Sequence, residues 1–334
     1  HLSEGQPPKI RVNGTISAIS DENLEGQSFK NLLAEICDSQ AFQKYLEEGD
    51  LDFAYEMDET SRFRCNYFRQ QHGLGAVFRL IPTKIATLEE LGVPTVVKEF
   101  AHMRSGLVLV TGPTGSGKST TLASIVDFIN QDRHDHIITL EDPIEYLIPS
   151  KNCHVNQREV HKHTESFARA LRGALREDPD VIMVGEMRDL ETISLALTAA
   201  ETGHLVLGTL HTGSAARTVD RVLDVFPVEQ RDQIRIMVSE SLRGIISQQL
   251  VPRADGNGRA LAIEMLVNTP AIANCIREGK TFMIPGCIQT GKAQGMILMD
   301  DSLRALHQAG LITTEDCIFR AEDKTIMKSF LGIK

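Results

Sequence analysis

A glycine-rich octapeptide in the first half of the chain restricts its fold more than any other feature. Residues 112–119 read Gly-Pro-Thr-Gly-Ser-Gly-Lys-Ser and match the pattern G-x-x-x-x-G-K-S. The apolar run at 106–111 predicts a buried strand before the loop, and residues 117–131 predict a helix after it. Strand, loop and helix in this order are the context that a phosphate-binding loop requires.

The residue types of this loop suit a nucleoside triphosphate. Glycines let backbone N–H groups turn toward phosphate oxygens, and the positive end of the following helix faces the same place. The lysine is expected to reach the β- and γ-phosphates, and the next serine to hold Mg²⁺, so ATP and Mg²⁺ are the expected ligands. A chance match is the alternative, at roughly one random chain in a hundred. The predicted nucleotide-binding residues are Gly112, Pro113, Thr114, Gly115, Ser116, Gly117, Lys118, Ser119 and Thr120.

Composition is that of an ordinary globular protein long enough for two domains. Of 334 residues, 42% are hydrophobic and 24% are charged. The 35 Lys and Arg against 45 Asp and Glu give a net charge of −10, which argues against general affinity for nucleic acid or anionic lipid. No apolar run approaches the ~18 residues that would span a bilayer. Six scattered cysteines without a C-x-x-C pair argue against a metal site or a disulfide framework.

The chain begins with a region whose pattern differs from the rest. Residues 1–81 predict a small α+β domain, and a connector follows at 82–105. Polar breaks separate the strands of this domain and predict an antiparallel meander. The predicted elements are helices near 27–38 and 40–49 and strands at 51–57, 62–69 and 75–81.

From residue 106 onward, apolar strands alternate with amphipathic helices, the pattern of a parallel sheet covered on both faces. Beyond residue 227 the chain is predicted to be mostly helical. The sequence Asp255-Gly-Asn-Gly258 interrupts this part and predicts a hairpin turn between two strand-like runs. The predicted strands are 106–111, 136–141, 180–185 and 205–210, and the predicted helices are 117–131, 164–177, 189–201 and 214–224.

Acidic residues follow two of these strands, at the edge where parallel sheets bind their ligands. Strand 136–141 ends in Glu141 and Asp142, and strand 180–185 is followed by Glu186 in the layout of a Walker B strand. A carboxylate there orients or deprotonates the attacking water, and we predict this role first for Glu186 and also for Glu141. The alternative is that these acids only cap helices. The residues expected to assist Mg²⁺, partly through water, are Ser119, Glu141 and Asp142.

Two histidines bracket strand 205–210. On a straight strand His204 and His211 would be roughly 23 Å apart, too far to share one metal ion. Only His211 follows the carboxyl end, so we predict that it senses the γ-phosphate, with a plain hydrogen-bonding role as the alternative. His204 is interpreted as structural or interfacial.

One predicted helix has a basic side. Arg169, Arg172 and Arg176 of helix 164–177 are spaced to lie on it. Such runs are usually solvated faces or subunit contacts, and this is our interpretation.

Taken in order, four blocks resemble the secretion and type IV pilus ATPases, and within them the pilus retraction ATPases. The loop at 112–119 resembles the Walker A motif of that family, and residues 138–145 resemble its Asp box. Residues 174–189 resemble its Walker B block, which also has glycine before glutamate. Residues 200–212 resemble its His box. The resemblance covers nearly the whole chain.

The resemblance implies an α/β fold and an assembly. It implies a PAS-like N-terminal domain at 1–81, a linker at 82–105 and a RecA-like ATPase domain at 106–334 with a mostly helical C-terminal region from about 227. It further implies a homo-hexamer in which the first domain packs on the neighbouring subunit's core. Arginines of this domain would reach the neighbour's nucleotide, which nominates Arg64 and Arg79 as catalytic. The sequence alone would interpret both as strand-surface charges.

The function implied by the resemblance is an ATP-hydrolysing motor that drives type IV pilus retraction. Such a protein is cytoplasmic and peripheral at the inner face of the membrane. The implied partners are an inner-membrane pilus platform protein, the assembly ATPase and a paralogous retraction ATPase, with no nucleic acid.

Three other functions remain as alternatives. A pilus assembly or type II secretion ATPase commonly has a tetracysteine zinc insertion, which this sequence lacks. The net charge of −10 argues against a nucleic-acid translocase. A regulatory protein without turnover is disfavoured by the presence of the four residues Lys118, Ser119, Glu141 and Glu186.

One segment departs from the family pattern. Residues 271–278 read Ala-Ile-Ala-Asn-Cys-Ile-Arg-Glu, where the retraction family has A-I-R-N-L-I-R-E. Ala273 replaces the first arginine and Cys275 replaces leucine. That motif is tied to retraction and not to hydrolysis, so we expect ATPase activity to survive and retraction to be the affected step.

Overall fold

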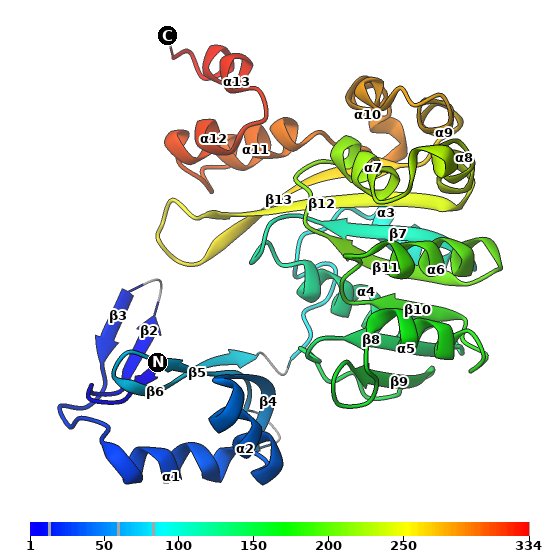
Figure 1. Cartoon of the computed structure of the whole chain (residues 1–334). Helices are drawn as coiled ribbons and strands as arrows, with labels where there is room; N and C mark the ends of the chain where they lie inside the picture. The colour runs from blue at the N-terminus through cyan, green and yellow to red at the C-terminus, as the bar shows by residue number, and fades with distance from the viewer. Residues whose placement is uncertain (13–14, 59–60, 82–83, 334) are drawn as a thin grey trace. The chain divides into compact units, whose positions relative to one another are not determined.

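The computed structural model describes residues 1–12, 15–58, 61–81 and 84–333, and these form two units (Figure 1). One unit comprises His1–Lys84 together with Pro143–Leu147. The other comprises Ile85–Asp142 and the chain from Ile148 onward. The first unit therefore includes a short segment that the sequence places inside the predicted ATPase domain.

The first unit is an antiparallel sheet packed against two helices, with strands in the order β1-β6-β5-β4. The predicted meander is confirmed, because β5 pairs with β4 and with β6 in antiparallel register. Strands β1, β2 and β3 were not predicted. The elements are β1 (Leu2–Ser3), β2 (Lys9–Val12), β3 (Thr15–Ala18), α1 (Gly26–Ile36), α2 (Ser39–Glu48), β4 (Asp50–Asp58), β5 (Ser61–Gln70) and β6 (Gly73–Ile81).

Local sequence sets the limits of α2. The Asp38 carboxylate accepts the backbone N–H groups of Gln40 and Ala41, which would otherwise lack a partner at the start of the helix. Gly49 ends the helix at φ 96°, a left-handed conformation that glycine adopts without strain. The helix buries Phe42 and Tyr45 against the sheet.

The second unit is built on a sheet with strands in the order β13-β12-β7-β11-β10-β8-β9. Neighbouring strands run parallel except β12 and β13, which are antiparallel. The strands are β7 (Gly106–Thr111), β8 (His136–Glu141), β9 (His154–Glu159), β10 (Val181–Val184), β11 (Leu205–Leu210), β12 (Leu242–Pro252) and β13 (Arg259–Val267).

Helices cover both faces of this sheet. Alternate strand residues point to opposite faces, so Leu107 and Leu109 join one hydrophobic core while Val108 and Val110 join another. The first core is closed by α5 to α10 and the second by α3 and α4. The helices are α3 (Val96–His102), α4 (Lys118–Asp132), α5 (Phe167–Ala174), α6 (Leu190–Glu201), α7 (Ala215–Asp224), α8 (Arg231–Ser241), α9 (Pro270–Arg277) and α10 (Ile284–Thr290).

The C-terminal part adds a hairpin and a small separate core. The predicted turn is confirmed, because Pro252 of β12 pairs with Arg259 of β13. The far ends of these strands pack with the last helices around Leu303 and Met327. The remaining elements are the short 3₁₀ turns η1 (Val228–Gln230), η2 (Thr281–Met283) and η3 (Lys292–Gln294), and the helices α11 (Met299–Gln308), α12 (Thr314–Arg320) and α13 (Lys324–Phe330).

Besides β1, β2 and β3, three elements differ from the sequence prediction. Helix α5 is shorter than the predicted 164–177, because Ser166 caps its start and the helix ends at Ala174. Strand β9 was not predicted, since its residues, His-Val-Asn-Gln-Arg-Glu, are mostly polar. Helix α3 lies inside the segment that the sequence suggested as a linker, and it packs in the core of the second unit.

Candidate active site

The glycine-rich loop follows β7 and turns on glycines that no other residue could replace without strain. Gly115 and Gly117 have φ values of 78° and 91°. Gly112 has φ 143°, and a Cβ added there would lie 2.3 Å from the Gln248 carbonyl oxygen of β12. The neighbouring strand therefore fixes the start of the loop.

The loop leaves the positive end of α4 open to a ligand. No side chain caps this helix, its N-cap is Gly117, and its first turn has no acidic residue. The Lys118 ammonium donates to the carbonyl oxygens of Gly112 at 2.9 Å and Pro113 at 3.1 Å. Ser116 Oγ is buried and has no hydrogen-bond partner among the described residues. These features suit an anion that accepts several N–H and O–H groups.

Strand register brings the predicted acids and His211 to the same edge as the loop. Leu210 at the end of β11 pairs with Thr111 at the end of β7. Val184 at the end of β10 pairs with Gly208 of β11 and with Leu140 of β8. Gly112 and His211 directly follow their strands, Glu186 comes two residues after β10, and Glu141 is the last residue of β8, so these residues lie at one edge of the sheet.

Glu186 is in direct contact with His211. Its Oε1 lies 2.9 Å from His211 Nε2, and Arg188 Nη2 donates to its Oε2 at 2.6 Å. Burial would raise the pKa of Glu186, but the Arg188 hydrogen bond and the charges of His211 and Lys118 outweigh it, so the pKa lies below the usual range. The Glu186 side chain is 20% exposed and is ionised at neutral pH.

Glu141 is more deeply enclosed than Glu186. Its Oε1 accepts hydrogen bonds from Thr139 Oγ1 at 2.8 Å and from Gln157 Nε2 at 3.0 Å. Gln157 belongs to β9, the strand that the sequence did not predict. Asp142, the next residue, is exposed. The two acids of this strand end therefore differ, with one held rigidly and the other open to solvent.

Arg64 and Arg79 of the first unit are direct cross-strand partners in β5 and β6. Side chains opposite each other on one sheet face are close, and like charges there repel. Arg64 Nη1 lies 3.9 Å from Glu145 Oε1, a weak and partly exposed ion pair of the same unit. Arg62, two residues before Arg64 and on the same face, is buried, and its Nε and Nη1 have no hydrogen-bond partner among the described residues.

Comparison with known proteins identifies the family. The family model for type II/IV secretion system proteins matches residues 43–324. The type IV pilus retraction ATPase PilT of Pseudomonas aeruginosa is 52% identical over 96% of this chain and 93% of its own length. A twitching motility protein of Neisseria gonorrhoeae is 49% identical over 96% of this chain and 86% of its own length. The chain belongs to the type II/IV secretion system protein family.

A solved structure agrees with this assignment. The crystal structure of the pilus retraction motor PilT with bound ADP has a TM-score of 0.91 and 47% identity, covering 98% of this chain and 94% of that one. The second unit has the mixed, mainly parallel sheet of a RecA-like ATPase core, and the first has an antiparallel sheet. Within the secretion system family, the chain is a PilT-type pilus retraction ATPase.

Sequence reasoning missed Glu264, which supports the segment after His211. Its Oε1 accepts the Ala215 N–H at 2.7 Å and its Oε2 accepts the Met299 N–H at 3.4 Å. These are the first residues of α7 and α11, so one buried carboxyl joins the starts of two helices. Burial raises the pKa of Glu264, although both backbone hydrogen bonds oppose the shift. A lone acid in the apolar run of β13 was the available signal.

A chain of hydroxyl groups was also missed. Thr111 Oγ1, at the end of β7, lies 2.8 Å from Ser247 Oγ of β12 and 3.5 Å from Thr218 Oγ1 of α7. Thr218 Oγ1 lies 2.6 Å from Thr212 Oγ1, next to His211. These contacts connect Thr111, just before the glycine-rich loop, with Thr212, at the end of the segment that resembles the His box.

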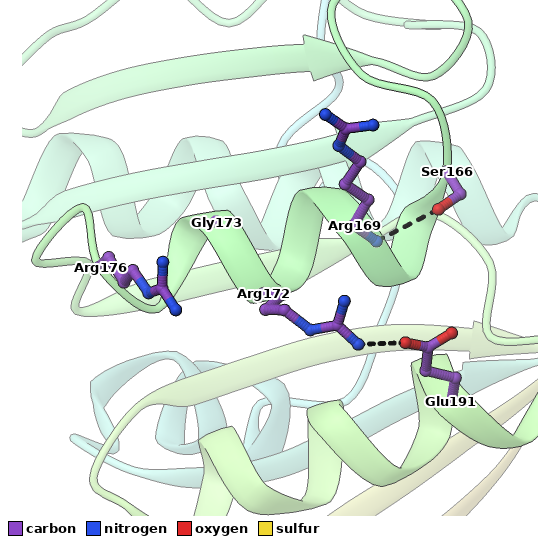
Figure 2. A pocket seen from close by; sticks show the side chains of 6 residues that line it. All are labelled: Ser166, Arg169, Arg172, Gly173, Arg176 and Glu191. Carbon is purple, nitrogen blue, oxygen red and sulfur yellow. Dashed lines mark hydrogen bonds and ion pairs between the residues drawn. The ribbon is translucent and has the colours of Figure 1, made fainter.

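The basic side of α5 lies beside a cavity of about 490 Å³ (Figure 2). Arg172 reaches Glu191 at the start of α6, and Arg169 pairs with Glu165. These pairs are more than half exposed, so they contribute little to stability. His204, outside this group, makes a hydrogen-bond contact through its ring, with Nδ1 3.0 Å from the Ala199 carbonyl oxygen near the end of α6. The cavity is lined by Ser166, Arg169, Arg172, Gly173, Arg176 and Glu191.

Within the described ranges, no group of three or more His, Cys, Asp and Glu side chains could hold a metal ion. Of the helices that the structure describes, none has the length and apolar character needed to cross a membrane.

Proposed function

We propose that the chain acts as a ring of six copies in which ATP hydrolysis drives retraction of a type IV pilus. The observation that carries this proposal is the gathering of loop, acids and histidine at one sheet edge, with Glu186 2.9 Å from His211. A retraction motor needs a nucleotide site whose occupancy changes contacts between subunits. The loop and its neighbours supply the first half of such a site.

The loop residues 112–120 would hold the nucleotide. On binding, Lys118 would exchange the carbonyl oxygens of Gly112 and Pro113 for phosphate oxygens, which are stronger acceptors because they are charged. The open N-terminus of α4 and the unpartnered hydroxyl of Ser116 are available to the same anion.

Mg²⁺ fits the donor set at this edge. Its preferred ligands are oxygens, and it commonly binds through one or two protein groups, water and substrate phosphates rather than a protein cage. Ser119 would supply a hydroxyl, with Asp142 and Glu141 acting partly through water. When bound, the ion would neutralise developing phosphate charge.

Glu186 is proposed as the group that orients the attacking water and accepts its proton. Its lowered pKa keeps the carboxylate ionised at neutral pH, as this role requires. His211, in contact with it, would register whether the γ-phosphate is present. Glu141 would hold the adjoining strand end, since Thr139 and Gln157 fix its carboxylate.

Arg64 and Arg79 would complete the site of the neighbouring subunit. The first unit, proposed to be a PAS-like domain, would pack on the next copy's ATPase core and direct both arginines at its nucleotide. Two opposed arginines repel each other in the isolated chain, and a shared anion would relieve that repulsion. This arrangement would make hydrolysis depend on contact between subunits, as an arginine finger does.

The expected partners follow from the retraction role. The ring would act at the cytoplasmic face of the membrane on an inner-membrane pilus platform protein. An assembly ATPase and a paralogous retraction ATPase would be further partners, and nucleic acid would not be a substrate.

Replacing Glu186 tests the catalytic assignment. We expect Glu186→Gln to bind a fluorescent ATP analogue about as well as the parent, and to release phosphate roughly a hundred- to ten-thousand-fold more slowly. Glu191→Gln is the control, because it removes an acid of the same unit whose one ion-pair partner among the described residues is Arg172. Phosphate release by Glu186→Gln at the parent rate would contradict the proposal.

A further inference from the structure

Two cysteine thiols meet in the second unit, far from the glycine-rich loop in sequence. Cys275 Sγ of α9 lies 3.9 Å from Cys287 Sγ of α10. Both cysteines are free, and twelve positions separate them along the chain. In the described part of the chain, no other pair of cysteine sulfurs makes a hydrogen-bond contact.

Packing holds this pair in place. Cys275 is 7% exposed and shares a core with Ile272 and Ile276 of its own helix. Cys287 packs against the same core, to which α10 contributes Ile284 and Ile288. A disulfide has an S–S bond of about 2.05 Å, so the sulfurs would have to approach by roughly 2 Å.

The two thiols are not equivalent. Burial raises the pKa of Cys275, and its contact with Cys287 adds to the effect, so Cys275 stays protonated. Cys287 is half-buried and is the more accessible sulfur. An oxidant from solution therefore reaches Cys287 first, with Cys275 next to it as the resolving thiol.

We propose that Cys275 and Cys287 are a redox modification site, at which a peroxide forms a reversible disulfide between α9 and α10. Cys287 gives up its thiol proton and its sulfur attacks one peroxide oxygen; the O–O bond breaks, the departing hydroxide takes that proton and leaves as water, and Cys287 becomes a sulfenic acid. The Cys275 sulfur then attacks the Cys287 sulfur, and the sulfenic hydroxyl leaves with the Cys275 proton as water. With hydrogen peroxide the balance is two thiols and one peroxide to one disulfide and two waters.

The disulfide would tie down a segment that the proposed catalytic site does not use. It would close a loop containing η2, where Phe282 is 79% exposed, and would fix α9, the helix in which residues 271–278 depart from the retraction-family pattern. The core that contains Cys275, and against which Cys287 packs, includes no residue of the glycine-rich loop. This site therefore does not depend on the roles proposed for Glu186 or the arginines.

Trypsin provides a direct test, because Arg277 and Lys280 separate the two cysteines. The whole protein is treated with hydrogen peroxide, alkylated with iodoacetamide in urea, digested without reductant and analysed by mass spectrometry. We expect peptides 260–277 and 281–292 to appear joined, two hydrogen atoms lighter than their sum. Dithiothreitol added before alkylation should abolish the joined species.

Single substitutions give matched controls. Cys37→Ser removes a half-buried cysteine of the other unit and should leave the joined peptide at the parent level. Cys287→Ser should abolish it and leave Cys275 reduced at the same peroxide dose. Cys275→Ser should leave Cys287 able to form a mixed disulfide with added glutathione. The proposal is overturned if Cys287 in the parent reaches sulfinic acid without any joined peptide, or if Cys275 oxidises equally fast in Cys287→Ser.

Discussion

The two units place their candidate functional residues in different ways. In the second unit, Glu141, Glu186 and His211 lie at or just past the carboxyl ends of parallel strands. In the first unit, Arg64 and Arg79 lie within strands and face each other across β5 and β6. Residues at strand ends are gathered by topology alone. Charged residues in the middle of a strand surface acquire a catalytic role only from a partner that covers that surface.

The contacts of the charged groups show the same difference. The Glu186 carboxylate already has Arg188 and His211 as partners in its own unit. Arg79 is exposed and faces another arginine, an arrangement that costs on the order of 0.5 kcal/mol. We therefore expect the acids to be organised in the single chain and the arginines to await a second copy.

The largest expected effect tests the arginines. Arg79→Ala should lower steady-state ATP hydrolysis about a thousand-fold, because it removes the positive charge proposed to act on the neighbour's nucleotide. Its melting temperature should be unchanged or slightly higher, since a like-charge pair disappears. Phosphate release and calorimetry measure the two quantities.

Lys44→Ala is the control for this prediction. Lys44 is an exposed cation of the same unit, and its one ion-pair partner in the described ranges is Glu48, four residues later in α2. Its loss should leave hydrolysis within about twofold of the parent, in keeping with the small effect of surface ion pairs. Equal rates of ATP hydrolysis by Arg79→Ala and Lys44→Ala would contradict the catalytic role proposed for Arg79.

Glu264 sharpens the comparison because it is also an ionisable residue in the middle of a strand, yet its partners belong to its own unit. Glu264→Ala should lower the free energy of unfolding by about 2 kcal/mol, since it leaves the Ala215 and Met299 N–H groups without their acceptor. Urea unfolding followed by circular dichroism measures this change. A loss comparable to that of an exposed carboxylate, such as Glu240→Ala, would refute a positioning role.

The pH dependence of Glu264 is a smaller effect. Its pKa is raised in the folded state, so the native protein binds more protons than the unfolded chain between the ordinary glutamate pKa and the raised one. Its contribution to stability is therefore fully present below the ordinary pKa and is lost as pH rises through the raised value. In Glu264→Gln this contribution to the pH dependence of the free energy of unfolding should vanish. Urea titrations from pH 4 to 7 measure that dependence, and an equal slope against pH in the parent and in Glu264→Gln would contradict the prediction.

Much of the second unit could be predicted because most of its strands are apolar and recognisable residues mark where those strands end. The loop motif fixed the end of β7, and strand periodicity placed Glu186 and His211 at the same edge. Even the pairing of Arg64 with Arg79 is implied by the break between the strands, because Gln70 pairs with Gly73 and the register follows from that turn. Nothing in their residue types, however, distinguishes these arginines from ordinary surface charges.

The rest could not be predicted for physical reasons. Strand β9 is polar because it lies at the edge of the sheet, so it has no apolar pattern. Strand β12 follows α8 directly at Leu242 with no glycine or proline between them, so its start resembles a continuing helix. The role of Glu264 depends on residues far away in sequence, and the Cys275–Cys287 contact depends on how α9 packs against α10; only the tertiary structure shows either.

Mixing two inactive variants tests the central claim, that each nucleotide site is shared between neighbouring copies. Glu186→Gln retains its arginines, and Arg79→Ala retains its glutamate. If Arg79 acts across subunits, co-assembly in equal amounts should restore roughly a quarter of the parent rate of phosphate release, because about one interface in four then joins an intact glutamate to an intact arginine. A rate no higher than the mean of the two separate variants would contradict the shared site.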